Sequence, residues 1–299
     1  MNTQDYKFFE ELLRKESGLI ITPEKMYLLE SRLLPLAQKY GIPNGLDGLA
    51  QKMRLTPNAE LQRAVVEAMT TNETSFFRDS TPFQRLKEDL LPSFVKSRAS
   101  QKTLRIWSAA CSSGQEPYSI AMLLKEYPQL AGWRFEIVAT DLSQDILAQA
   151  KAGVYSQFEI QRGLPIQMLV KYFDKQGDSW AVKPAQKESI TFKTANLLSD
   201  INHLGQFDIV FCRNVLIYFD VPTKAKVLSA IKGVVKQDGI LFLGGAETVI
   251  GISEAFKPLA DIRGVYVRAD SSFIADKKAP APPPAAAPAA AIAASVGKK

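Results

Sequence analysis

The side chains best suited to bind a charged small molecule lie in short turns that follow apolar runs. The first such turn is Cys111-Ser112-Ser113-Gly114. It follows an apolar run of strand length, residues 103–109, and precedes a helical pattern over residues 115–124. A strand, a turn of small residues and a helix form the first unit of a doubly wound α/β sheet. In such a sheet, ligands bind beyond the carboxyl ends of the strands.

The glycine content of this turn restricts the ligand, because Gly114 is its only glycine. A dinucleotide site requires G-x-G-x-x-G, so that the backbone can approach a pyrophosphate. The absence of that pattern argues against NAD and FAD. A nucleoside ligand without a diphosphate needs a less close approach, and S-adenosylmethionine fits this description.

Asp141 follows the next apolar run, residues 134–139, and lies 27 residues after Gly114. Nucleoside-binding sheets place the acceptor for the ribose hydroxyls at this point. Asp141 also precedes a helix expected over residues 143–151, so it could instead be the N-cap of that helix. The residues of this stretch alone leave both roles open.

The segment T-N-E-T-S-F-F-R-D, residues 71–79, combines polar side chains with two adjacent aromatics. An ordinary linker does not require Asn72, Thr74 and Arg78 so close to Phe76-Phe77. This combination predicts a polar clasp that a hydrophobic anchor fixes to the main domain. The Arg78 guanidinium can hydrogen-bond a carboxylate in a fixed, planar geometry.

The remaining pattern predicts a helical domain followed by an α/β domain. Before residue 75, apolar stripes at helical spacing alternate with turns that contain proline and glycine. Further strands are expected at 190–192, 207–211 and 240–243, with a helix over 223–236 and a closing antiparallel pair at 256–259 and 265–267. The expected divisions are an all-helical N-terminal domain (1–75), a linker helix (76–102), an α/β domain with a Rossmann-like sheet (103–270) and an inserted small β-subdomain (about 153–187), and a disordered Ala/Pro-rich tail (271–299).

Composition argues against several functional classes. The net charge is +6, but the C-terminal tail supplies three units of it and no basic stripe is present, so nucleic acid is a poor partner. The chain has one histidine, His203, in a loop-like context, and two cysteines, so no metal cluster is expected. Cys111 and Cys212 both end predicted strands, and we expect free buried thiols. No signal-peptide profile or apolar run of about 18 residues is present, so we expect a cytoplasmic protein without membrane insertion.

Five segments, in this order, resemble the CheR-type chemotaxis receptor methyltransferases. They are T-N-E-T-S-F-F-R (71–78), A-C-S-S-G-Q-E-P-Y-S (110–119), A-T-D (139–141), N-L-L (196–198) and F-C-R-N-V-L-I-Y-F-D (211–220). The resemblance extends from about residue 5 to residue 268. It implies a protein-glutamate O-methyltransferase that uses S-adenosylmethionine, releases S-adenosylhomocysteine and esterifies glutamates in the cytoplasmic helical region of methyl-accepting chemotaxis receptors. It also implies a monomer.

The resemblance assigns a role to each matching residue. Asn72, Thr74 and Arg78 should contact the methionine end of the cofactor, and Glu116 its charged amino or sulfonium region. Asp141 should hold the ribose, and Asn196 with Leu197 should flank the adenine. The remaining assignments place the methyl-donor site beside Arg213 and Asn214, with Tyr218 reaching toward the acceptor. Arg78 and Tyr218 are the expected catalytic residues.

The chain departs from the family pattern in several places. Gly244-Gly245-Ala246-Glu247 stands where many members have G-H-S-E, so no role depends on a histidine there. The second helix keeps one arginine, Arg32, which puts docking through an arginine-rich helix in doubt. The short segment 174–178 predicts a protein that does not need a receptor C-terminal pentapeptide.

Methyl transfer to a glutamate carboxylate agrees with this composition. A glutamate carboxylate is already anionic at neutral pH, so no general base is required. Alignment and the exclusion of water should supply most of the rate acceleration.

Three alternative functions differ from this one. The first, a nucleic-acid methyltransferase, would carry a D/N-P-P-Y/F motif where Arg213-Asn214-Val215-Leu216 stands. A non-catalytic adaptor that senses the cofactor, and a methyltransferase for small carboxylates, remain the other two.

Overall fold

The computed structural model describes residues 1–271 and 273. Within these residues the main body is a seven-stranded sheet of order β6-β2-β1-β7-β8-β10-β9. Its strands are β1 (Thr103–Ala109), β2 (Arg134–Asp141), β6 (Ile190–Thr194), β7 (Phe207–Cys212), β8 (Val235–Leu243), β9 (Phe256–Pro258) and β10 (Val265–Arg268). Strands β6, β2, β1, β7 and β8 are parallel, whereas β10 runs antiparallel to β8 and to β9. The Rossmann-like fold expected from the sequence is confirmed.

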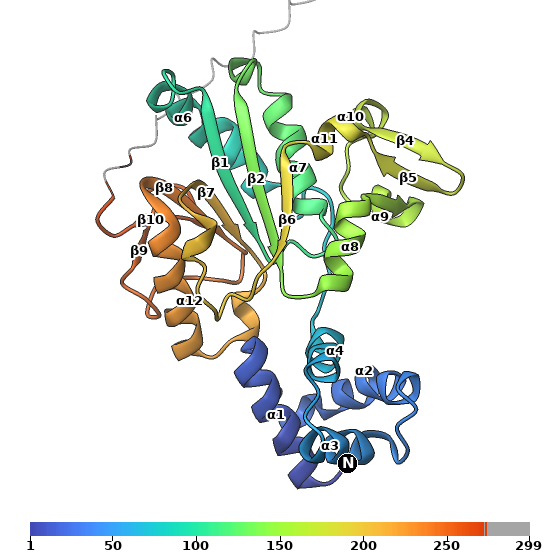
Figure 1. Ribbon diagram of the computed structural model, residues 1–299. Coiled ribbons are helices and arrows are strands. Elements are labelled where there is room, and N and C mark those ends of the chain that lie inside the picture. Colours follow the sequence, from blue (N-terminus) through green and yellow to red (C-terminus); the bar gives the residue numbers. More distant parts are fainter. Residues whose placement is uncertain (272, 274–299) are drawn as a thin grey trace, which may run out of the picture.

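Helices cover both faces of this sheet, because its central strands are apolar on both sides. Every residue of β7 is buried. Ile209 and Phe211 belong to a core shared with α7 (Gln115–Lys125) and α8 (Gln144–Ala152). Val210 and Cys212 belong to a second core, shared with α12 (Val221–Val234). Figure 1 shows the resulting layers.

Helix α12 begins two residues earlier than its apolar pattern predicts. The side chain of Asp220 accepts a hydrogen bond from the Thr223 backbone amide and caps the helix. Pro222 also lies in the first turn, where a proline has no intrahelical bond to lose.

The N-terminal residues form four helices, α1 (Thr3–Ser17), α2 (Met26–Lys39), α3 (Gly45–Leu55) and α4 (Ala59–Met69). They enclose a core of their own, which includes the fully buried Phe9, Leu13, Leu29 and Leu33. The group lies beyond the end of the sheet at which the parallel strands terminate (Figure 1). Several polar contacts join it to the sheet domain. Among them, Arg14 pairs with Asp220 at 2.6 Å, and the Ser143 hydroxyl donates to the Glu67 carboxylate at 3.0 Å.

A bent helical segment connects the two parts. It consists of α5 (Thr81–Arg85), a π-helical turn (Leu86–Leu90) and α6 (Leu91–Ser97). This helix covers less of the chain than the linker helix expected over 76–102. Phe77, Asp79 and Ser80 have positive φ angles of 48°, 66° and 42°, which prevent a helix before residue 81.

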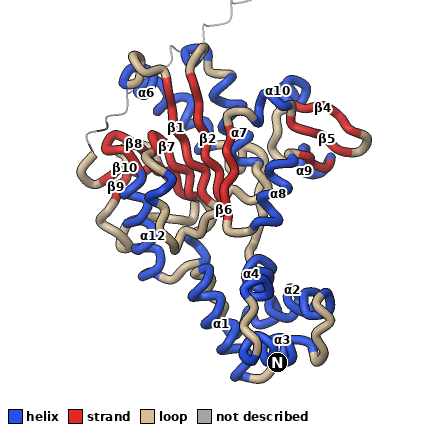
Figure 2. The backbone as a smooth tube through the Cα atoms, in the orientation of Figure 1, coloured by secondary structure: helices blue, strands red, loops and turns tan. Residues whose placement is uncertain are grey.

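Between α8 and β6 the chain forms a separate three-stranded antiparallel sheet of order β3-β5-β4 (Figure 2). It contains β3 (Val154–Ser156), α9 (Gln157–Gln161), α10 (Ile166–Tyr172), β4 (Phe173–Gln176), β5 (Ser179–Val182) and α11 (Pro184–Lys187). Only Gly177-Asp178 separates β4 from β5, and Gly177 has a φ of 59°, as a two-residue hairpin turn requires.

The tail expected to be disordered, 271–299, lies outside the described residues except for residues 271 and 273. Phe273 packs against Phe94 of α6, with ring centroids 5.6 Å apart. Within the described part of the chain, no helix is both long and apolar enough to cross a membrane.

Candidate functional site

The loops that follow the parallel strands meet where the strand order reverses, between β1 and β7. The chain goes from β1 to β2 and β6 on one side, then returns to β7 and β8 on the other, which opens a crevice between their carboxyl ends. A cavity that is open to solvent lies there. All ten residues expected at the site line it: Asn72, Thr74, Arg78, Glu116, Asp141, Asn196, Leu197, Arg213, Asn214 and Tyr218.

Asp141, the last residue of β2, orders the turn that follows β1. Its Oδ2 accepts a 2.8 Å hydrogen bond from the Ser112 amide, and its Oδ1 accepts a 3.1 Å bond from the Ser143 amide. Burial raises the pKa of the Asp141 carboxyl, while these backbone bonds act in the opposite direction. Helix α8 is capped by the Ser143 hydroxyl, which accepts from the Ile146 amide. The N-cap role for Asp141 is therefore excluded, and its carboxylate lines the cavity.

The segment 71–79 is anchored as its two aromatics predict. Phe76 is fully buried and makes edge-to-face contacts with Tyr155 and Phe173 of the inserted subdomain. The Phe77 amide donates to the Ser119 hydroxyl of α7 at 2.9 Å. These contacts fix the polar part of the segment at the rim of the cavity.

Polar contacts on either side of this anchor complete the attachment of the segment. The Ser112 hydroxyl donates to the Asn72 carbonyl at 2.8 Å, and the Arg78 guanidinium donates to the Glu73 carbonyl at 2.7 Å. Arg78 remains half-buried at the cavity wall, so part of its guanidinium is open to a ligand.

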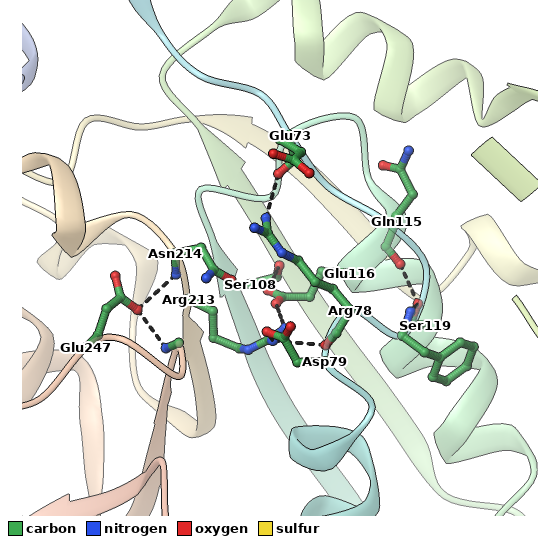
Figure 3. A network of polar contacts seen from close by, with 12 residues as sticks. Glu73, Arg78, Asp79, Ser108, Gln115, Glu116, Ser119, Arg213, Asn214 and Glu247 are labelled. Carbon is green, nitrogen blue, oxygen red and sulfur yellow. Dashed lines mark hydrogen bonds and ion pairs between the residues drawn. The ribbon is translucent and has the colours of Figure 1, made fainter. Parts of the chain in front are cut away.

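An ion-pair network centred on the buried Arg213 lies at the cavity wall, and Figure 3 shows its polar contacts. The Arg213 side chain is 2% exposed, and its Nη1 lies 3.0 Å from Oε2 of Glu116. Its Nη2 donates to the Asp79 carboxylate at 2.7 Å and to the Arg78 carbonyl at 2.9 Å. The other Glu116 oxygen accepts from the Ser108 hydroxyl at 2.8 Å. One guanidinium thus connects β7, α7 and the segment that carries Arg78.

The side-chain amide of Asn196 forms hydrogen bonds with the protein backbone, so it is not free to contact a purine as expected. Its Nδ2 donates to the Glu16 carbonyl at the end of α1 (2.6 Å), and its Oδ1 accepts from the Leu198 amide (3.0 Å). These bonds leave Leu197, Leu142 and Leu19 as apolar wall on this side of the cavity.

Tyr218 lies in the loop that follows β7 and also lines the cavity. Its backbone carbonyl accepts from the Ile20 amide at 3.1 Å, so the N-terminal helices also support this loop. The Tyr218 ring is half-buried, and within the described residues its hydroxyl has no hydrogen-bond partner. The hydroxyl is therefore available to a ligand in the cavity.

Strained backbone is concentrated around this cavity. Ala110, Ser112 and Asn214 have φ angles of 55°, 51° and 58° and line the cavity, and Phe77 and Asp79 flank Arg78 with φ angles of 48° and 66°. Such conformations persist where the surrounding contacts impose them, and they often mark functional sites.

Among the contributors that sequence reasoning missed are Asp79 and Ser112. Asp79 follows Arg78 directly, and its charge was the only available signal. Ser112 lies in a turn whose role is visible only when the Asp141 carboxylate and the Asn72 carbonyl are seen beside it. His203 is exposed, as expected, and both cysteines are free and buried. No group of potential metal ligands occurs among the described residues.

The donor and acceptor set of the cavity fits S-adenosylmethionine. Asp141 retains acceptor capacity for a hydroxyl beside its bonds to backbone amides, and Glu116 offers a carboxylate for a cationic centre. Arg78 offers a partner for a carboxylate, and the leucines offer an apolar wall for a purine.

Comparison with known proteins agrees with this fit. The family model described as "CheR methyltransferase, SAM binding domain" matches residues 72–264. Together with the parallel sheet, this match defines the class: a methyltransferase whose cofactor is S-adenosylmethionine. The chain belongs to the CheR methyltransferase family.

Curated relatives of the whole chain are chemotaxis protein methyltransferases. Chemotaxis protein methyltransferase Cher2 of Pseudomonas putida is 43% identical over 270 residues, which cover 89% of this chain and 98% of the relative. Chemotaxis protein methyltransferase 1 of Pseudomonas aeruginosa is 43% identical over 272 residues (89% and 97%). The chemotaxis protein methyltransferase of Vibrio parahaemolyticus is 39% identical over 261 residues (86% and 94%).

Proposed function

We propose that this protein transfers a methyl group from S-adenosylmethionine to glutamate carboxylates of bacterial chemoreceptors, forming methyl esters. One observation carries the proposal. A single cavity at the ends of the parallel strands brings together Arg78, Tyr218 and the eight other expected residues, and no histidine lines it within the described residues.

This composition suits a carboxylate acceptor. When bound, the cofactor supplies a sulfonium methyl group, whose S–C bond breaks as the new C–O bond to the carboxylate forms. The acceptor is anionic at neutral pH, so the protein needs no general base. The Cys111 thiol is not a competing nucleophile, because burial raises its pKa well above the ordinary value. The work left to the protein is alignment, which can contribute up to about 7–11 kcal/mol.

The cofactor-binding roles follow the positions of the residues around the cavity. We assign Asp141 to the ribose hydroxyls, Asn196 and Leu197 to the purine end, and Glu116 to the cationic region. The methionine end would be held by Asn72, Thr74 and Arg78, with Arg213 and Asn214 beside the methyl group. The bonds from Asn196 to Glu16 and Leu198 indicate that its backbone and its neighbour, rather than its amide, face the purine.

Arg78 and Tyr218 are the proposed catalytic residues. Arg78 would orient either the acceptor glutamate or the cofactor carboxylate through its planar guanidinium. Tyr218, which also lines the cavity, would close the opposite side through its phenolic hydroxyl, which has no hydrogen-bond partner among the described residues.

We further propose a cytoplasmic monomer that docks on the helical cytoplasmic region of the receptors without gripping a C-terminal pentapeptide. The two-residue turn between β4 and β5 supports the second point, because it leaves little loop to cradle a peptide. The Arg32 guanidinium donates to the Met69 and Thr70 carbonyls at 2.7 and 2.9 Å, so it fixes the chain that leads into the site rather than projecting toward a partner.

The test is incubation with tritiated S-adenosylmethionine and receptor-containing membranes, followed by alkali. Release of volatile methanol, in a smaller amount with Tyr218→Phe, is the expected result, because esters are alkali-labile and N-methyl groups are not. Alkali-stable label on nucleic acid would indicate the nucleic-acid alternative instead. Label on small carboxylates alone would indicate a small-molecule enzyme.

A further inference from the structure

The loop that carries Arg213, Asn214 and Tyr218 depends on one carboxylate outside it, that of Glu247. The chain leaves β8 through Gly244-Gly245-Ala246 and turns back, with the Glu247 amide donating to the Gly244 carbonyl at 2.9 Å. Because Cys212 of β7 pairs with Leu243 of β8, the residues that follow these strands lie side by side. The buried Glu247 side chain lies between the two loops.

This carboxylate accepts four backbone amides. Its Oε2 accepts from Gly244 at 2.6 Å and from Asn214 at 2.9 Å, and its Oε1 accepts from Val215 at 3.0 Å and from Ile217 at 3.3 Å. Figure 3 shows Glu247 directed at the Asn214 backbone. A carboxylate has about four lone-pair sites, so its acceptor capacity is fully used.

Gly244 provides the space that this arrangement needs. A Cβ at Gly244 would lie 2.7 Å from Oε2 of Glu247 and 3.0 Å from the Asn214 amide. The adjacent Gly245 has nothing within 4 Å of such a Cβ. The two neighbouring glycines therefore differ in the space that is available for a Cβ atom, so alanine substitutions at these two positions form a matched pair of variants.

The anchored loop includes a residue in a left-handed conformation. Asn214 has a φ of 58°, which asparagine adopts more readily than most residues but which still depends on the surrounding contacts. The bonds of Glu247 to the amides of Asn214 and Val215 impose this conformation. They also fix the start of the short 3₁₀ turn Leu216–Tyr218, which presents Tyr218 to the cavity.

We propose that Glu247 is a positioning residue for methyl transfer: it acts through Asn214 and Tyr218, by fixing the 213–218 loop in its reactive conformation. Only the expected effect on kcat rests on the proposed function; the expected effects on the loop conformation and on the Kd do not. In Glu247→Gln an amide NH₂ would replace one acceptor oxygen and oppose backbone N–H donors. The loop would then sample other conformations, while Asp141 and Leu197, which do not belong to this loop, would still bind the cofactor.

The experiment compares Glu247→Gln and Gly244→Ala with the matched control Gly245→Ala in the full-length protein. Three quantities are measured: hydrogen exchange of peptides covering residues 212–218, the Kd for S-adenosylhomocysteine by calorimetry, and kcat with receptor membranes. We expect faster exchange in both test variants, a kcat lower by about tenfold to a hundredfold, and a Kd within about threefold of wild type. Gly245→Ala should match wild type in all three.

Two results would overturn the inference. One is unchanged exchange and kcat in Glu247→Gln and Gly244→Ala. The other is a kcat that falls only in proportion to the folded fraction, or to the loss of S-adenosylhomocysteine affinity, which would make Glu247 a stability or cofactor residue. Exchange and Kd need no acceptor. If wild-type protein methylated no receptor, the proposed function would fail while the exchange comparison still decided the role of Glu247 in the loop.

Discussion

Replacing Glu116 by glutamine removes one charge from the ion-pair network at the cavity wall. It separates two possible roles of that charge, which are pairing with Arg213 and contact with the cationic end of the cofactor. The amide keeps the size of the side chain and an acceptor for the Ser108 hydroxyl. It loses the ionic bond to Arg213, whose guanidinium still has Asp79 and the Arg78 carbonyl as partners. Because those partners remain, the loss in folding free energy should be that of one hydrogen bond between charged groups, about 1.5–3 kcal/mol.

The same substitution tests whether Glu116 also faces the cationic end of the cofactor. S-adenosylmethionine carries a sulfonium charge that S-adenosylhomocysteine lacks. If Glu116 acts on that charge, Glu116→Gln should weaken binding of S-adenosylmethionine by a larger factor than binding of S-adenosylhomocysteine. Calorimetric titration with both ligands measures the difference, and urea unfolding measures the stability term.

Ser108→Ala is the matched control, since it removes the other bond to Glu116 and leaves its charge in place. It should weaken the two ligands equally. The reasoning would be refuted by equal weakening of both ligands in Glu116→Gln, which would confine Glu116 to pairing with Arg213. An unchanged free energy of unfolding in Glu116→Gln would refute the expected loss of about 1.5–3 kcal/mol in stability.

Four further predictions follow from the described contacts. Asp141→Ala should weaken S-adenosylhomocysteine binding by about 1.5–3 kcal/mol. An unchanged affinity in calorimetry would mean that Asp141 only orders the turn at Ser112. Arg78→Ala should lower kcat/KM about 100-fold, or roughly 2.7 kcal/mol, and Arg78→Lys should restore little; full activity of the lysine variant would mean that charge alone suffices. Tyr218→Phe should lower kcat with cofactor affinity nearly unchanged, and a matching loss of affinity would place the hydroxyl on the cofactor instead. Arg98 holds the pKa of the Asp238 carboxyl below its ordinary value, so this pair stabilises the fold above about pH 4 and loses its effect as pH falls through the lowered pKa. The stability difference between wild type and Asp238→Asn in urea titrations should therefore shrink at acid pH, and a difference independent of pH would contradict the assignment.

Much of the fold and the composition of the site were predictable, because both depend on local pattern. Apolar runs such as 207–211 predict buried parallel strands, and the strands that the sequence predicts agree with the observed sheet. Parallel strands end at one edge, so polar residues that directly follow such runs, such as Asp141 and Arg213, must converge. This geometry explains why the expected residues that follow strands line one cavity. Asn72, Thr74 and Arg78 reach it from the segment before β1 and were expected there from the family resemblance.

The internal organisation of the site was not predictable, because it depends on pairings distant in sequence. Glu116 and Arg213 are 97 residues apart, and no local pattern indicates that they form an ion pair. The role of Glu247 depends on the adjacency of β7 and β8 and on the space beside Gly244. The choice between a ribose contact and an N-cap at Asp141 depended on Ser143, two residues later, which caps the helix instead.

The most direct test of the proposed function is mass-spectrometric mapping of a purified receptor after incubation with this protein and S-adenosylmethionine. The proposal predicts that each modified peptide gains the mass of one methylene group on a glutamate in the helical cytoplasmic region. Mild base should remove this gain, and protein carrying Tyr218→Phe should produce much less of it. A receptor that remains unmodified by active, cofactor-binding protein, or a base-stable methyl group on another residue type, would contradict it.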